Sequence, residues 1–103
     1  MNKVAVIWST EALVDLENIS DFLAEKSPSG ANRIVENILS RTRQIENFPG
    51  SGAEQKTLKN TGREYHYLVE GNYKIIYSYQ AERQAVYVEI IFDTRQNPDD
   101  LKV

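Results

Sequence analysis

The chain has 103 residues, of which 41% are hydrophobic, and its formal net charge is −3. This length suits one domain and leaves no room for a second, so we expect residues 1–103 to form a single domain. The absence of cysteine excludes disulfides, thiolate metal sites and cysteine nucleophiles, and it favours a reducing, cytoplasmic location. The negative net charge argues against binding a nucleic acid through the overall field of the protein.

The first residues predict a short strand rather than a targeting or membrane segment. The apolar run covers only Val4 to Trp8, which is too short for a signal-peptide core or a membrane span. We therefore expect no membrane contact. In residues 3–8, apolar side chains, several of them β-branched, occupy odd and even positions alike. This is typical of a strand covered on both sides.

Two amphipathic helices are predicted next. Ser9 and Thr10 offer N-cap hydroxyls for the first helix, and Ser27 with Pro28 is typical of the start of the second. The opposite face of the first helix should face solvent, and it carries Asp15, Glu17, Asn18, Asp21 and Glu25. The apolar stripe of the second helix is Ala31, Ile34, Val35, Ile38, Thr42 and Ile45. Pro49 and the glycines after it should end this helix.

From residue 64 onward apolar residues recur at every second position, as in β-strands, which predicts a three-stranded meander. Turns are expected at residues 71–72 and 81–84. On the last strand one face should carry Val86, Val88, Ile90 and Phe92. The order β-α-α-β-β-β predicts an α+β fold in which a helical hairpin packs on a small, mostly antiparallel sheet. Residues 49–62 are expected to form a long irregular loop that carries Lys56 and Lys59.

Few residues of catalytic type are present. The single histidine, His66, has no partner at a fixed spacing, and no metal-ligand cluster or phosphate-binding glycine motif is visible, so we expect no metal and no cofactor. The tyrosines of the meander should mostly be core residues and cross-strand pairs. Tyr65, Tyr67, Lys74 and Arg95 nevertheless form a candidate site if they converge at one end of the sheet, because tyrosines interleaved with cations can stack bases and hold phosphates.

Four segments in order resemble the ParE/RelE superfamily of bacterial toxins from type II toxin–antitoxin systems, also described as plasmid-stabilisation proteins. They are VIWSTEALVDLENISDFL, FPGSG, GNYKIIYSY and VEIIFDTRQNP, and together they span nearly the whole chain. The resemblance implies a small cognate antitoxin as partner. It also implies one of two activities, since ParE-like members poison DNA gyrase whereas RelE-like members are ribosome-dependent endoribonucleases that cut mRNA.

Compared residue by residue, the RelE pattern is only partly present. Its lysine pair falls on Tyr65 and Tyr67, its strand arginine on Lys74 and its carboxy-terminal tyrosine near Leu101, while its late arginine is kept as Arg95. Without these lysines, little would stabilise the charge that develops during phosphodiester cleavage. The resemblance therefore favours the ParE-like branch, in which Arg95 is expected to pair with Asp93 or with a carboxylate of the antitoxin.

We interpret the chain as a ParE-like toxin that inhibits DNA gyrase and replication when it is free of its antitoxin. Two alternatives stay open. One is a ribosome-dependent mRNA endoribonuclease that uses Arg95, Lys74, His66, Tyr65 and Tyr67. The other is a decayed toxin that only binds its antitoxin.

Overall fold

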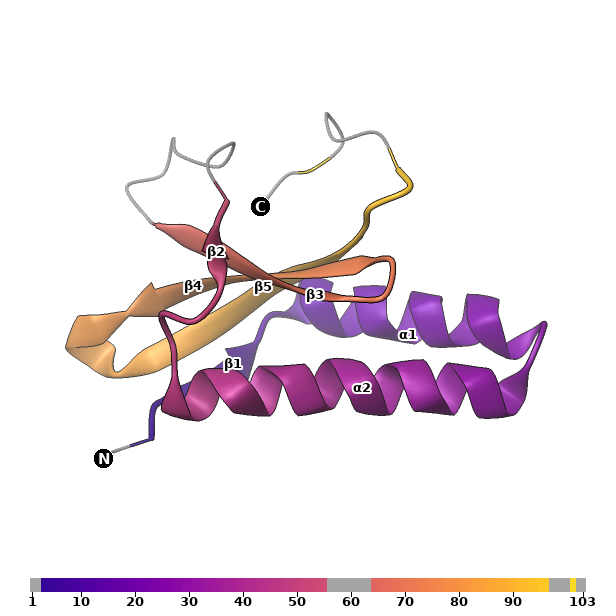
Figure 1. Cartoon of the computed structure of the whole chain (residues 1–103), viewed down its shortest axis with the longest axis horizontal. Coiled ribbons are helices and arrows are strands. Elements are labelled where there is room, and N and C mark those ends of the chain that lie inside the picture. The colour runs from indigo at the N-terminus through magenta and orange to yellow at the C-terminus, as the bar shows by residue number, and fades with distance from the viewer. Residues whose placement is uncertain (1–2, 56–63, 97–100, 102–103) are drawn as a thin grey trace.

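The computed structural model describes residues 3–55, 64–96 and 101. Its elements are β1 (Ala5–Trp8), α1 (Thr10–Ala24), α2 (Pro28–Asn47), β2 (Ala53–Glu54), β3 (Tyr65–Glu70), β4 (Tyr73–Gln80), a 3₁₀ turn (Ala81–Arg83) and β5 (Ala85–Asp93). The two helices lie side by side on one face of the sheet (Figure 1). We call this the inner face and the opposite one the outer face. The predicted α+β fold with a helical hairpin is confirmed.

The sheet is mixed, with the strand order β1-β5-β4-β3-β2. β1 is parallel to β5, and all other neighbours are antiparallel. The sequence does not predict β2, because this strand occupies two residues of the segment that is expected to be irregular. It pairs with β3 in the register Ala53 to Tyr67. Lys56 and Lys59 of that segment lie outside the described residues.

β1 differs from its prediction as a strand covered on both sides. It lies at an edge of the sheet and pairs with β5 alone. Val6 and Trp8 pack against the core under the helices, whereas Ala5 and Ile7 are exposed on the outer face. The prediction is wrong because helices cover only one face of the sheet. Apolar residues at consecutive positions of a strand therefore do not guarantee that both of its faces are covered.

A serine side chain caps the N-terminus of each helix, as predicted. The Oγ of Ser9 accepts a hydrogen bond from Ala12 N, and the Oγ of Ser27 accepts one from Gly30 N. Each contact satisfies a backbone donor that has no partner within the helix. The predicted stripe of α2 is buried at Ala31, Ile38, Thr42 and Ile45.

A bulge in β5 overturns the prediction that four of its apolar residues share one face. Tyr77 pairs with Val88 but Ile76 pairs with Ile90, so Glu89 is an extra residue at this step. An extra residue reverses the side to which the following side chains point. Val86 and Val88 therefore belong to the core beneath the helices, and Ile90 and Phe92 belong to a second apolar cluster on the outer face.

The first helix also departs from its predicted pattern. The sequence also predicts an apolar stripe of Ala12, Leu13, Leu16, Ile19, Phe22 and Leu23 on this helix. Leu13 and Phe22 of that stripe are 53% and 51% exposed, while Asp15 of the expected solvent face points to the sheet and accepts a hydrogen bond from Ile91 N. The helix is thus rotated relative to the simple stripe, with Asp15 in contact with β5.

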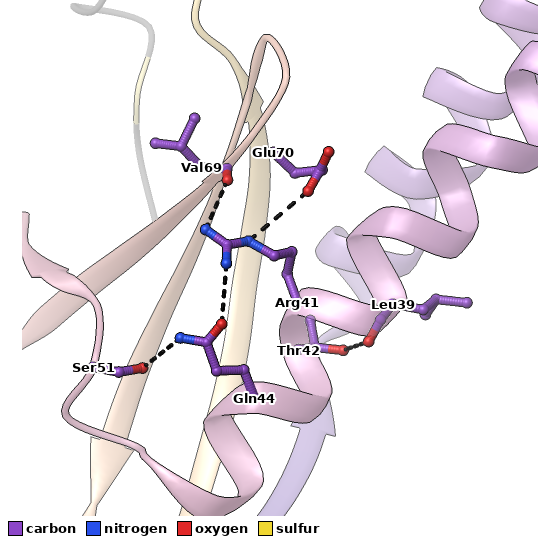
Figure 2. A network of polar contacts seen from close by, with 7 residues as sticks. All are labelled: Leu39, Arg41, Thr42, Gln44, Ser51, Val69 and Glu70. Carbon is purple, nitrogen blue, oxygen red and sulfur yellow. Dashed lines mark hydrogen bonds and ion pairs between the residues drawn. The ribbon is translucent and has the colours of Figure 1, made fainter.

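Polar side chains fasten α2 to the end of the β3–β4 hairpin, as Figure 2 shows. The guanidinium of Arg41 donates to Val69 O at 3.1 Å and to Gln44 Oε1 at 3.0 Å, and its Nε lies 3.8 Å from a carboxylate oxygen of Glu70. Gln44 in turn donates to Ser51 Oγ at 3.2 Å. Arg41 thereby links α2, β3 and the segment that leads into β2.

Candidate functional site

Three of the predicted site residues share the outer face. Tyr65 is buried there in the cluster with Ile76, Ile90 and Phe92, and Leu101 packs against the same cluster. The Nζ of Lys74 lies 4.2 Å from the centroid of the Tyr67 ring, a cation–π geometry. Lys74 also donates to Gln55 Oε1 at 3.4 Å. The structure therefore brings Lys74 and Tyr67 together in a half-buried setting.

His66 projects to the inner face instead. Its ring stacks on Tyr77 with 5.7 Å between the centroids, and its Nδ1 lies 3.3 Å from Gly52 O. Its Nε2 is 3.8 Å from the exposed carboxylate of Glu64. The strand alternation places His66 and Tyr67 on opposite faces of β3, so the histidine does not join Lys74.

The hydroxyl of Tyr77 holds the chain between α2 and β2. It donates to Pro49 O at 2.9 Å and accepts from Gly52 N at 3.0 Å. Burial raises the pKa of Tyr77, and the hydrogen bonds at Gly52 and Ser51 oppose that rise. The Tyr77 side chain is fully buried, and through these two part-buried contacts it satisfies one donor and one acceptor of the backbone.

Arg95 forms a bidentate ion pair with Asp93. Its Nε and Nη2 donate to the two carboxylate oxygens at 2.9 and 2.8 Å, and its backbone N also donates to Asp93 at 2.9 Å. These hydrogen bonds from Arg95 lower the pKa of Asp93. The expected pairing of Arg95 with Asp93 is thus confirmed. Asp93 pairs in register with Tyr73 of the inner face, so Arg95 stands on the helix side and away from Lys74.

A cleft of about 500 Å³ opens between α1 and the ends of β4 and β5. We call it the α1–β5 cleft. Its apolar surface comes from Ile19 and Phe22 of α1 together with Tyr73 and Ile91 of the sheet, and its polar rim includes Asp15, Asp93 and Arg95. Asp15, Ile19 and Phe22 share one helix face because they are three or four residues apart. Arg95 is therefore part of a cleft that contains none of the other four predicted site residues.

The sequence pattern misplaces three residues of this cleft. It predicts Asp15 and Asn18 on the solvent face and Phe22 in the core, whereas all three lie at the cleft. The sequence carries a signal for the first, since an aspartate four residues before an apolar Ile19 sits at core spacing. Within residues 3–55, 64–96 and 101, no group of three or more acidic or histidine side chains could hold a metal ion.

Comparison with solved structures shows the class of fold. A chain of the chromosomal ParDE TA system from P. aeruginosa matches with a TM-score of 0.69 and 16% sequence identity, over 88% of this chain and 96% of that one. At this low identity the match is one of fold, and it shows that the mixed sheet with a helical hairpin on one face is shared with that chain.

Comparison with families identifies the protein further. Residues 6–98 match the ParE toxin of type II toxin–antitoxin systems, parDE, so the chain belongs to the ParE toxin family. The predicted resemblance to ParE-like toxins is confirmed. No curated protein matches the chain with significant similarity. Neither of the two described helices is long and apolar enough to cross a membrane.

Proposed function

We propose that this ParE-family toxin inhibits DNA gyrase, and thereby replication, when it is free of a small antitoxin encoded beside it. Family membership over residues 6–98 supports the role of toxin. The similar solved chain comes from a ParDE toxin–antitoxin system, which supports an antitoxin as partner. The proposed place of action is the cytoplasm, where gyrase works.

The dispersal of the candidate nuclease residues is the observation that favours gyrase over the ribosome as the target. Cleavage of a phosphodiester needs a base, an acid and a cation around one phosphate. Here Lys74 lies against Tyr67 on the outer face, whereas His66 stacks on Tyr77 on the inner face. Arg95 is bound to Asp93. Such an arrangement supports an inhibitor that binds its target rather than one that cuts RNA.

Exposed apolar side chains support an antitoxin that wraps the toxin. On α1, Leu13, Val14 and Phe22 are 53%, 48% and 51% exposed, and Ile7 of β1 is 44% exposed. An antitoxin segment that folds on binding could cover these residues with its own apolar anchors. We accordingly expect the free toxin to be poorly soluble and its complex with the antitoxin to be well behaved.

A supercoiling assay with purified gyrase tests the proposal. The toxin should stop supercoiling, and equimolar antitoxin should restore it. A parallel assay with mRNA on programmed ribosomes should show no cleavage. If mRNA is cut, and the double variant Lys74→Ala, Arg95→Ala does not cut it, the toxin is an endoribonuclease. If neither assay responds while the antitoxin still binds, the chain is a decayed toxin.

A further inference from the structure

We propose that the α1–β5 cleft is a docking site for a basic segment of the antitoxin, one that places an apolar side chain beside Phe22 and a lysine or arginine near Asp15. This inference rests on the proposed function, because it names the part of the partner that this cleft receives. The cleft has a cavity volume of about 500 Å³, which is room for a few side chains. The apolar surface and the charges of the cleft each limit what can enter.

The apolar surface of the cleft provides an anchor point. Phe22 is 51% exposed on α1, with Ile19 of the same helix and Tyr73 and Ile91 of the sheet forming the rest of the apolar lining. One cation lies nearby, since the Nζ of Lys26 is 5.3 Å from the centroid of the Phe22 ring. A half-exposed aromatic ring beside a buried apolar surface is the kind of residue on which binding energy concentrates.

Asp15 supplies an unneutralised negative charge at the rim. Its Oδ2 accepts one hydrogen bond from Ile91 N, and no ion pair to Asp15 exists in the described part of the chain. Burial is the main cause that raises the pKa of Asp15, and the nearby Glu11 raises it further. A partner cation near Asp15 would offset both effects.

Arg95 does not supply that cation, because Asp93 already binds it. Two side-chain hydrogen bonds join the guanidinium to this carboxylate. A carboxylate of the antitoxin would have to break this pair to reach Arg95, whereas a cation could approach Asp15 with the pair intact. The surrounding charge acts in the same direction, since residues 10–26 contain five carboxylates and Lys26 as the single cation. Electrostatic complementarity therefore selects a basic segment over an acidic one.

Two substitutions with matched controls test the docking site. Phe22→Ala removes the aromatic anchor, and Phe48→Ala removes a phenylalanine that is 56% exposed outside the cleft. Asp15→Asn removes the charge but keeps an oxygen that can accept from Ile91 N, and Asp21→Asn removes an exposed charge on the same helix that does not line the cleft. Thermal melts should show that all four variants fold. The affinity of each for the antitoxin, expressed from the reading frame beside this gene, is then measured at low and high salt.

We expect Phe22→Ala to weaken antitoxin binding by about tenfold or more. Asp15→Asn should weaken binding by about fivefold at low salt, with the loss shrinking at high salt because a surface attraction is screened. Both controls should stay within about twofold of the unmodified toxin.

Three results would overturn the inference. If Phe22→Ala and Asp15→Asn bind like their controls, the antitoxin docks elsewhere although it remains the partner. A loss confined to Phe22→Ala removes the basic character of the segment. Normal antitoxin binding with lost growth inhibition would assign the cleft to the target. Failure of the unmodified toxin to bind any antitoxin would instead contradict the proposed function itself.

Discussion

The carboxylate of Asp15 on α1 accepts the backbone N–H of Ile91 on β5 at 2.9 Å, joining residues 76 positions apart. A second contact runs from Ser9 Oγ to Glu89 O at 2.7 Å. Both lie beyond the end of β1, whose last pair is Trp8 with Val88. Side chains at the start of α1 therefore bind the edge of β5 where the neighbouring strand has ended, next to the bulge at Glu89.

The stability of the protein should depend on Asp15 with a definite sign. The pKa of Asp15 is raised above 3.8 by burial, so between pH 3.8 and that raised pKa the folded state binds more protons than the unfolded state. Stability from this group therefore falls as the pH rises through this window. The amide that replaces the carboxylate in Asp15→Asn does not titrate, so the stability of this variant relative to the unmodified protein should increase as the pH rises through the window.

Urea denaturation of both proteins, from about pH 3 to about pH 7, measures this difference. Asp93 acts in the opposite direction, because its pKa is lowered below 3.8 and its stabilising contribution is lost as the pH falls through that lowered value. Since both proteins contain Asp93 and its partner is solvent-exposed, its small contribution cancels in the comparison. A stability difference that stays constant with pH would contradict the assigned burial of Asp15.

Gly52 should tolerate no side chain. A Cβ at this position would lie 2.6 Å from both Tyr67 O and the hydroxyl of Tyr77, so Gly52→Ala forces the chain or the buried tyrosine to move. We expect it to lower the free energy of unfolding by about 1–3 kcal/mol. Gly50→Ala is the matched control, because a Cβ there meets nothing within 4 Å. Equal stability of the two variants in chemical denaturation would refute the close approach at Gly52.

The hydroxyl of Tyr77 should contribute through the two backbone groups that it satisfies. Tyr77→Phe leaves Gly52 N and Pro49 O without this partner at a part-buried position, at an expected cost of about 1–3 kcal/mol. Tyr79→Phe, on the same strand but 36% exposed, should change stability by less than about 0.5 kcal/mol. Hydrogen exchange gives a second measurement, since the amide of Gly52 should exchange faster in Tyr77→Phe.

The Arg41 network predicts a contrast within α2. Arg41→Ala removes the hydrogen bonds to Val69 O and Gln44, and it should destabilise the fold by about 1 kcal/mol. Arg43 is exposed on the same helix, so Arg43→Ala should have an effect below about 0.5 kcal/mol. Arg41→Lys should restore little, because an ammonium lacks the planar fork that reaches both acceptors. Equal unfolding midpoints for the two alanine variants would show that the network adds no stability.

Local patterns in the sequence predict the helices and their caps, because these depend on nearby residues. Ser9 and Ser27 cap the helices as expected, and Gly71 at the turn between β3 and β4 has the positive φ of 58° that favours glycine. The bulge in β5 is not predicted, because a pattern that assumes strict alternation does not allow for one extra residue. The adjacent apolar residues Ile90 and Ile91 are a sign of it, because a strictly alternating strand would make one of them polar.

The candidate site is harder to predict than the fold. A simple alternation does not tell which face a residue occupies once a bulge intervenes, so the sequence leaves open whether Arg95 and Lys74 converge. In the structure Asp93 and Tyr73 place Arg95 on the helix side, away from Lys74. The bidentate pair with Asp93 is predictable, since the two residues are only two positions apart. The cleft is not, because it depends on how α1 is rotated against β5.

Pulse labelling after induction tests whether the free toxin stops replication. Cells that express the toxin without its antitoxin are given labelled precursors of DNA and of protein over the first minutes. We expect DNA synthesis to fall first, while protein synthesis continues and the DNA-damage response rises. An early fall in protein synthesis with DNA synthesis intact would contradict gyrase inhibition and direct attention to Lys74 and Arg95 as phosphate-binding residues.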